Sequence, residues 1–279
     1  MESAGGSMPP LLLIHPVGVG LSSRFWDRFI RRWHAEDPEG ELYAPDLIGC
    51  GEADCSRDPL TPDDWAQPLV AMLHERNDGP AVVVAQGTTL PIALAMLERA
   101  PEQVCGLVAI SPPGWRVLHE KFPIERAQQL WRWLFRGPVG NLFYRYARRR
   151  NFLKSFSQKN LFAQAKDVDE EWLQALNEGS KNMNSRWAVY SFLAGFWRRD
   201  WEPQLTSLTL PLQVIFGGSA TGIGRSRSWD DLEQRLATYR DKLPDAVIET
   251  IPGRNVLPYE SPEDCVNCVR SWFFDQHWE

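Results

Sequence analysis

The sequence predicts an α/β fold in which a doubly wound, mostly parallel sheet carries a helical insertion. Two observations predict the sheet: short apolar runs rich in Val, Ile and Leu recur along the chain, and stretches with apolar residues at helical spacing separate them. A third observation is that this alternation stops between residues 115 and 203, where helical patterns continue without strands. We therefore divide the chain into a core (residues 1–114 and 204–279) and a helical cap (residues 115–203).

The alternation can be followed in order along the chain. Residues 81–85 are apolar without a polar break, which is typical of a central strand, and a helical pattern begins directly afterwards at Leu90. Thr61-Pro62-Asp63-Asp64 has the residues of a helix start. The predicted strands are 11–14, 41–44, 81–85, 104–110, 210–216 and 246–251. The predicted core helices are 23–34, 61–76, 90–97, 229–242 and one from about 262.

Composition is that of an ordinary globular protein, with 43% hydrophobic and 24% charged residues and a net charge of −6. The negative charge and the lack of a recognised motif argue against a nucleic-acid partner. Five cysteines without a secretory leader favour reduced thiols and a cytoplasmic location. Cys265 and Cys268 have no histidine or second pair nearby, so we expect buried helix thiols, no metal and no cofactor. No run approaches the ~18 apolar residues of a membrane span.

The turn after residues 81–85 is the most informative local feature. A strand that enters a helix so abruptly needs small side chains where the two elements nearly touch, and Ala85 and Thr89 meet that need on either side of Gly87. Glycine also adopts the positive φ of a tight turn without strain. Centring the turn on Thr88 would put the bulky Gln86 in a tight position, so we favour Gly87.

Five segments in the same order make the chain resemble the α/β-hydrolase superfamily over nearly its whole length. Each segment is similar to one of the superfamily's motifs. In order they are residues 15–17 (the oxyanion loop, His-Gly-x), 46–54 (D-x-x-G-x-G-x-S-D), 85–89 (the nucleophile elbow, G-x-S-x-G), 215–220 (I-x-G-x-x-D) and 251–260 (I-x-x-x-G-H-x-x-x-E). The resemblance implies the α/β-hydrolase fold, with the cap over the carboxyl ends of the strands, where such sheets bind ligands.

The resemblance also implies where a catalytic triad would stand. Acyl transfer needs a nucleophile, a base and an acid that orients the base. The three positions hold Gly87, Val256 and Ala220, and the alternative acid position after residue 110 holds Ser111. The chain has no histidine between residues 120 and 276. We therefore expect no catalytic residue and a pseudoenzyme that serves as a ligand- or partner-binding module.

Two other functions stay open. An ester or amide hydrolase with a non-standard nucleophile would depend on Thr88 or His15, whereas a cofactor-free lyase or oxygenase is less favoured, since relatives of that type usually keep their histidine. The oxyanion hole uses backbone N–H groups, here those of Val17 and Thr88. With His15, Thr89 and Ser111 beside them, we expect a small apolar or carbonyl-bearing ligand.

The cap differs from the rest of the chain in charge. It holds 16 Lys and Arg against 9 Asp and Glu, a net charge of +7, which leaves about −13 elsewhere, and it holds seven of the 13 tryptophans. This mixture of basic and aromatic residues suits either an anionic membrane surface or an acidic protein partner. With the first, we expect a peripheral position at a membrane. The alternative is that the aromatic side chains pack the cap while the arginines solvate its outer face. The residues expected on the cap surface are Trp131, Trp133, Arg148, Arg149 and Arg150.

Overall fold

The computed structural model describes residues 8–222 and 231–278, and within them six strands form one parallel sheet in the order β2-β1-β3-β4-β5-β6. The strands are β1 (Leu11–Ile14), β2 (Leu42–Tyr43), β3 (Ala81–Gln86), β4 (Val104–Ile110), β5 (Leu212–Gly217) and β6 (Val247–Ile251). The predicted α/β-hydrolase fold with a doubly wound, parallel sheet is confirmed. Strand β3 lies between β1 and β4 and is buried along its whole length.

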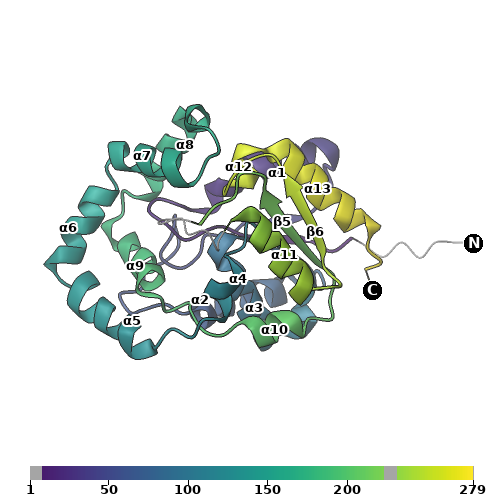
Figure 1. Cartoon of the computed structure of the whole chain (residues 1–279), viewed down its shortest axis with the longest axis horizontal. Coiled ribbons are helices and arrows are strands. Elements are labelled where there is room, and N and C mark those ends of the chain that lie inside the picture. Colours follow the sequence, from purple (N-terminus) through teal and green to yellow (C-terminus); the bar gives the residue numbers. More distant parts are fainter. Residues whose placement is uncertain (1–7, 223–230, 279) are drawn as a thin grey trace, which may run out of the picture.

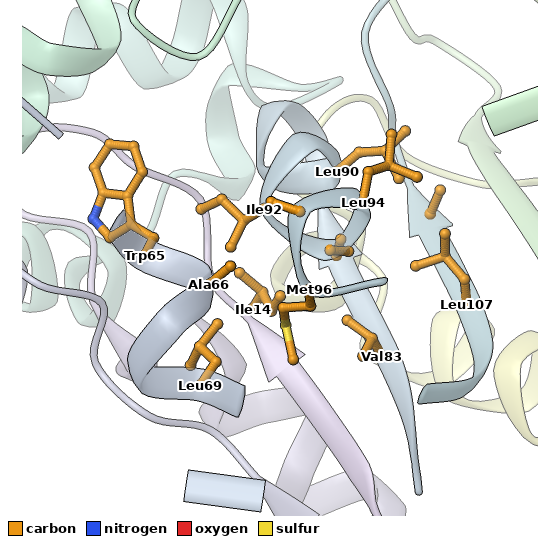
Figure 2. Close-up of a cluster of buried hydrophobic side chains, with 14 of the residues drawn as sticks. Ile14, Trp65, Ala66, Leu69, Val83, Leu90, Ile92, Leu94, Met96 and Leu107 are labelled. Carbon is orange, nitrogen blue, oxygen red and sulfur yellow. The ribbon is translucent and has the colours of Figure 1, made fainter. Parts of the chain in front are cut away.

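Successive residues of the strands face two separate hydrophobic clusters, as the period of two along a strand requires. Val83 packs with α2 and α3 on one face, whereas Val82 and Val84 pack with α1 and α13 on the other. Figure 2 shows the first cluster, in which side chains of α2 and α3 lie against those of β1, β3 and β4. The helices are α1 (Asp27–Glu36), α2 (Pro62–Arg76), α3 (Leu90–Arg99), α11 (Leu232–Lys242) and α13 (Pro262–Asp275).

The core elements differ from the prediction mainly at their ends. The helix expected over 23–34 begins as a single 3-10 turn before α1, and the strand expected over 41–44 is reduced to the two residues of β2. Two short helices, α10 (Glu202–Thr206) and α12 (Leu257–Glu260), were not predicted, because four or five residues are too few to show a helical period. Residues 229–230 of the core helix predicted over 229–242 lie outside the described residues, and α11 begins at Leu232.

Between β4 and β5 the chain forms helices without strands, as predicted. They are α4 (Trp115–His119), α5 (Ile124–Leu130), the π-helix η4 (Trp131–Phe135), α6 (Pro138–Ala147), α7 (Arg150–Asn160), α8 (Glu170–Gly179) and α9 (Arg186–Ala194). Figure 1 shows α5, α6 and α7 along the edge of the molecule away from both termini, with α9 on their inner side. A third hydrophobic cluster lies among α5, η4, α6 and α9.

Two helices of this segment, α4 and α8, pack on the core rather than in the third cluster. Trp115 and Leu118 of α4 join the hydrophobic cluster of α2 and α3, and Trp172 of α8 joins the cluster of α1 and α13. The boundaries 115 and 203 of the cap therefore stay a prediction. In the described parts of the chain, every helix is too short or too polar to cross a membrane.

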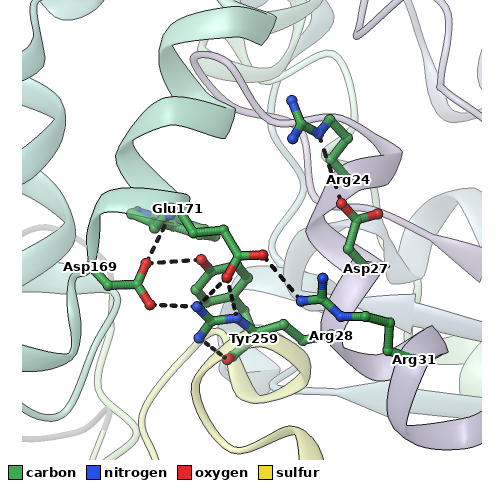
Figure 3. A network of polar contacts seen from close by, with 8 residues as sticks. Arg24, Asp27, Arg28, Arg31, Asp169, Glu171 and Tyr259 are labelled. Carbon is green, nitrogen blue, oxygen red and sulfur yellow. Dashed lines mark hydrogen bonds and ion pairs between the residues drawn. The ribbon is translucent and has the colours of Figure 1, made fainter.

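An ion-pair network joins α8 to the core (Figure 3). Arg28 of α1 donates hydrogen bonds to Asp169 and Glu171 at the start of α8, and its guanidinium lies 3.9 Å from the centroid of the Tyr259 ring. Asp169 also accepts hydrogen bonds from the Tyr259 hydroxyl (3.0 Å) and the Trp172 N–H (2.9 Å). Burial raises the pKa of the Asp169 carboxyl, but the hydrogen bonds it accepts outweigh burial and hold that pKa below its usual range.

We expect Asp169→Asn to lower the free energy of unfolding by about 1 kcal/mol at neutral pH, because asparagine still caps α8 but loses the charge facing a partly exposed Arg28. A carboxyl whose folded pKa is lowered stabilises fully above its unfolded pKa, about 3.9, and this contribution disappears as the pH falls through the folded pKa. The free energies of unfolding of the two proteins, measured by urea melts, should therefore converge as the pH is lowered below the folded pKa of Asp169. A difference independent of pH would show that the charge of Asp169 contributes nothing.

Candidate functional site

The turn between β3 and α3 places Gly87 at the carboxyl end of the central strand. Gly87 has a φ of +64°, a conformation that favours glycine, and a single 3-10 turn (Gly87–Thr89) leads from it into α3. An added Cβ at Gly87 would meet one described atom within 4 Å, the main-chain oxygen of Ser111 at 3.8 Å. The turn therefore has the geometry predicted for an elbow, with space where a nucleophilic side chain would stand.

Thr89 is fully buried and stabilises this turn from inside. Its hydroxyl donates to the main-chain oxygen of Gln86 at 3.0 Å and lies 3.5 Å from the main-chain oxygen of Ile14. These contacts fasten the turn to its own strand and to β1. A role of Thr89 in ligand binding stays a prediction, but its hydroxyl already donates a hydrogen bond within the turn.

His15 follows β1 and is completely buried. Its Nδ1 donates to the main-chain oxygen of Pro16 at 3.0 Å, and its Nε2 accepts a hydrogen bond from the N–H of Leu47 at 3.0 Å. Burial lowers the pKa of the imidazole, more than its hydrogen bond to Pro16 and the nearby charge of Asp46 raise it. His15 is therefore a neutral residue that joins two loops, and neither ring nitrogen is free to act as a base.

The predicted oxyanion donors lie after neighbouring strands. Ile14 at the end of β1 pairs with Ala85 near the end of β3, so the loop that carries Val17 and the turn that carries Thr88 leave the same edge of the sheet. Val17 is buried and Thr88 is half-buried. The role of these two backbone N–H groups as oxyanion donors stays a prediction.

Two buried polar atoms at this edge have no hydrogen-bond partner among the described residues. They are the hydroxyl oxygen of Ser111, which follows β4, and the side-chain carbonyl oxygen of Gln86, which ends β3. Gln86 pairs with Ile110, so the two residues leave adjacent strands, and Ser111 has a φ of +48°. A buried polar atom without a partner is costly, and such atoms are often completed by water or a ligand.

The loop after β5 would carry the acid and the loop after β6 would carry the base. Hydrogen bonds of Asn255 and Arg254 join these two loops. Ala220 and Val256 are both buried. The side-chain amide of Asn255 donates to the main-chain oxygens of Thr221 (3.0 Å) and Asn160 (2.8 Å), and the main-chain oxygen of Asn255 accepts from the Gln86 amide (2.7 Å). The guanidinium of the neighbouring Arg254 donates to the Thr221 hydroxyl.

Sequence reasoning missed this network. Its signals were a polar residue, Gln86, at the end of an otherwise apolar strand and a polar pair directly before Val256. The network uses amides, a hydroxyl and main-chain oxygens, none of which transfers protons near neutral pH. It can hold the three loops in place but cannot relay a proton.

The five histidines of the chain are either exposed or already engaged in hydrogen bonds. His34, His74, His119 and His277 are exposed, and both ring nitrogens of His15 are occupied. The described residues also contain no cluster of His, Cys, Asp and Glu that could hold a metal ion. Cys265 and Cys268 are buried thiols on α13, as predicted.

The structure confirms only some of the cap residues expected at the surface. Trp133 is 78% exposed and Arg149 is exposed, as predicted. The prediction for Trp131 is wrong: it is buried, and its ring packs against those of Trp187 and Phe196. Its spacing of four residues from both Ala127 and Phe135, which are also buried, was the signal of an inward-facing stripe.

The two other predicted arginines have partners within the protein. Arg148 is half-buried, with its guanidinium 3.2 Å from the sulfur of Met183. Arg150 is exposed but forms an ion pair with Glu170 of α8. Both lie near the surface, yet neither is as free as Arg149 to meet a ligand or partner.

Comparison with known proteins extends this description. The model of the "Alpha/beta hydrolase family" matches residues 11–267. Lipase LipV of Mycobacterium tuberculosis is 34% identical over 102 residues, which are 37% of this chain and 36% of the lipase, so the chain matches about a third of that relative's length.

Solved structures resemble the whole chain. A serine hydrolase involved in carbazole degradation (CarC) has a TM-score of 0.73 at 17% identity, covering 97% of this chain and 93% of that one. An esterase from Thermogutta terrifontis has a TM-score of 0.71 at 19% identity, covering 96% and 90%. At these identities the likeness concerns the fold alone.

We expect Gly87→Ala to lower the free energy of unfolding by about 1–3 kcal/mol, since alanine is strained at this positive φ although its Cβ has room. The matched control is Gly218→Ala, because Gly218 is exposed, does not have a positive φ, and an added Cβ there would come no closer than 3.7 Å to the neighbouring atoms. The control should change stability by about 0.5 kcal/mol or less. Equal denaturant midpoints for the two variants would contradict the assignment of Gly87 to the strained turn.

Proposed function

The chain belongs to the alpha/beta hydrolase family, whose model matches residues 11–267, and from this membership we propose that it binds a carbonyl- or carboxylate-bearing ligand at the elbow without hydrolysing it. The observation that carries the proposal is the bare backbone at Gly87, which stands at the nucleophile position and leaves room for an added Cβ. Ala220 and Val256, at the acid and base positions, add no titratable group. The cytoplasmic location and the absence of a nucleic-acid partner stay predictions.

Hydrolysis of an ester requires an oxygen or sulfur nucleophile and a base that takes its proton. The Thr89 hydroxyl is engaged within the turn, and His15 has both ring nitrogens occupied. The segments that would bring acid and base together are instead fastened by Asn255 and Thr221. These contacts favour a site that keeps its shape and lacks the proton transfers of acyl transfer.

The groups at the elbow suit a ligand that both accepts and donates hydrogen bonds. We propose that the backbone N–H groups of Val17 and Thr88 donate hydrogen bonds to a carbonyl or carboxylate oxygen. The unpartnered Ser111 hydroxyl can donate or accept, and the unpartnered carbonyl oxygen of Gln86 can only accept. A carboxylic acid, hydroxy acid or amide matches this set better than a hydrocarbon does.

A second candidate is an ester or amide hydrolase with a non-standard nucleophile, for which Thr88 and Ser111 carry the available hydroxyls. The names of the relatives, a lipase, an esterase and a serine hydrolase, favour this candidate over the first. The residues of the site favour the first, because no described base lies beside either hydroxyl. Turnover separates the two candidates directly.

We expect no hydrolysis of p-nitrophenyl octanoate above the protein-free rate, because nucleophile and base are both missing. The assay includes Thr88→Ala and Ser111→Ala, which would each abolish turnover if that hydroxyl attacked the ester. Hydrolysis by the unaltered protein that either substitution removes would overturn the proposal in favour of the second candidate.

Binding is tested separately with octanoate, and with octan-1-ol as the matched compound without a carboxylate. A ligand that binds only the folded state stabilises it by RT ln(1 + [L]/Kd), so at equal concentration the tighter ligand raises the melting temperature more. Octanoate should raise the melting temperature of the protein more than octan-1-ol does, and Ser111→Ala should reduce the difference. Equal effects of the two compounds would contradict a site for carbonyl or carboxylate oxygens.

A further inference from the structure

Helix α6 has an apolar face that points away from the rest of the protein. Val139, Leu142 and Tyr146 follow one another at helical spacing and are all more than half exposed. Tyr144 and Ala147 on the other side of the helix are buried, Tyr144 within the third hydrophobic cluster. A helix at a protein surface normally turns polar residues outward. Figure 1 shows α6 at the outermost edge of the molecule, opposite both termini.

The apolar face extends onto the elements on both sides of α6. Trp133 of η4 is the most exposed of the large apolar residues described, and the ring of Tyr146 lies 5.1 Å from Phe152 of α7. Of the 13 exposed large apolar side chains in the described residues, nine lie between residues 124 and 156. We call these nine the outer cap surface: Ile124, Leu130, Trp133, Leu134, Val139, Leu142, Phe143, Tyr146 and Phe156.

Positive charge is concentrated in the same segment. Residues 121–160 contain ten Lys and Arg and a single acidic residue, Glu125. Arg132, Arg136 and Arg145 are exposed and form no ion pair with any described residue. Arginine can lay its apolar stem along a hydrophobic surface while its guanidinium reaches a phosphate, so these side chains and the apolar face can act together.

We propose that the outer cap surface docks on an anionic lipid bilayer, with its apolar side chains entering the boundary between headgroups and acyl chains. Tryptophan, tyrosine and arginine are the residues that favour this boundary. A bilayer fits the outermost edge of a molecule without a shaped partner surface, whereas an acidic protein would require no array of nine exposed apolar side chains. The net positive charge of the segment complements anionic lipid.

A groove between α6 and α7 adds a second observation. It has a volume of about 650 Å³, and its lining combines the rings of Tyr146, Phe152 and Phe156 with the basic side chains of Arg149 and Lys159. The basic residues suit a lipid phosphate, and the rings suit the first part of an acyl chain. The groove lies at the end of the outer cap surface, because Tyr146 and Phe156 belong to both.

Co-sedimentation with vesicles tests the proposal on the full-length protein. We expect recovery with phosphatidylcholine vesicles that contain phosphatidylglycerol and little recovery with phosphatidylcholine alone. Salt should weaken the binding, since the screening length falls from about 10 Å at 0.1 M to about 3 Å at 1 M ionic strength. Absence of binding to anionic vesicles, or equal recovery on both lipids, would overturn the proposal.

Charge and apolar contact are tested by separate variants, each with a matched control. Arg132→Glu with Arg145→Glu should weaken binding at least about 25-fold, because each basic residue near anionic lipid contributes roughly fivefold. The control pair Arg99→Glu and Arg240→Glu makes the same change in net charge at exposed arginines on α3 and α11. Equal losses in the two pairs would contradict docking through the cap.

Trp133→Ser with Leu142→Ser removes two exposed side chains of the outer cap surface and should weaken binding roughly tenfold or more. The control is Phe274→Ser, which alters an exposed apolar residue on α13. The outer cap surface could instead bind a second copy of the chain, and sedimentation velocity without lipid tests this alternative. A dimer that the paired serine substitutions dissociate would assign this surface to self-association and contradict the proposal. The outcome does not depend on the function proposed for the elbow.

Discussion

The positive φ of Gly87 is the backbone constraint around which the carboxyl edge of the sheet is arranged. The central strand β3 must end and α3 must begin within three residues, and α3 must then pack closely on the sheet. Ala93 and Ala95 are fully buried and allow this approach. Thr89 fastens the turn to β3, and the loops after β1, β4, β5 and β6 gather around it. Glycine adopts this positive φ without strain, so the turn requires no larger side chain at residue 87.

The loops around this turn are held by contacts that do not titrate. Asn255 joins the loops after β6 and β5 through the Thr221 oxygen, reaches α7 through the Asn160 oxygen, and accepts a hydrogen bond from Gln86. Three segments that would carry a triad thus meet through amides and main-chain oxygens. These hydrogen bonds can hold the three segments together without an ion pair between them.

The sequence predicted the sheet well because the buried strands are short, mainly apolar runs bounded by turn residues. It missed α10 and α12, which are too short to show a helical period. It also placed Trp131 on the surface, because that prediction used the aromatic content of the segment and not the four-residue spacing of Ala127, Trp131 and Phe135. The elbow could be predicted since its residues are adjacent. The bond between Gln86 and Asn255 could not, because it joins residues 169 positions apart that only the fold brings together.

Covalent labelling with a fluorophosphonate tests the central claim, a kept elbow without a nucleophile, most directly. Such reagents phosphonylate an activated hydroxyl whether or not the enzyme's substrate is known, so the result does not depend on choosing an ester. Intact-mass spectrometry should show the unmodified mass of the protein after prolonged exposure. A single added phosphonyl group, mapped to Thr88 or Ser111, would show that the site retains a reactive nucleophile and would contradict the account.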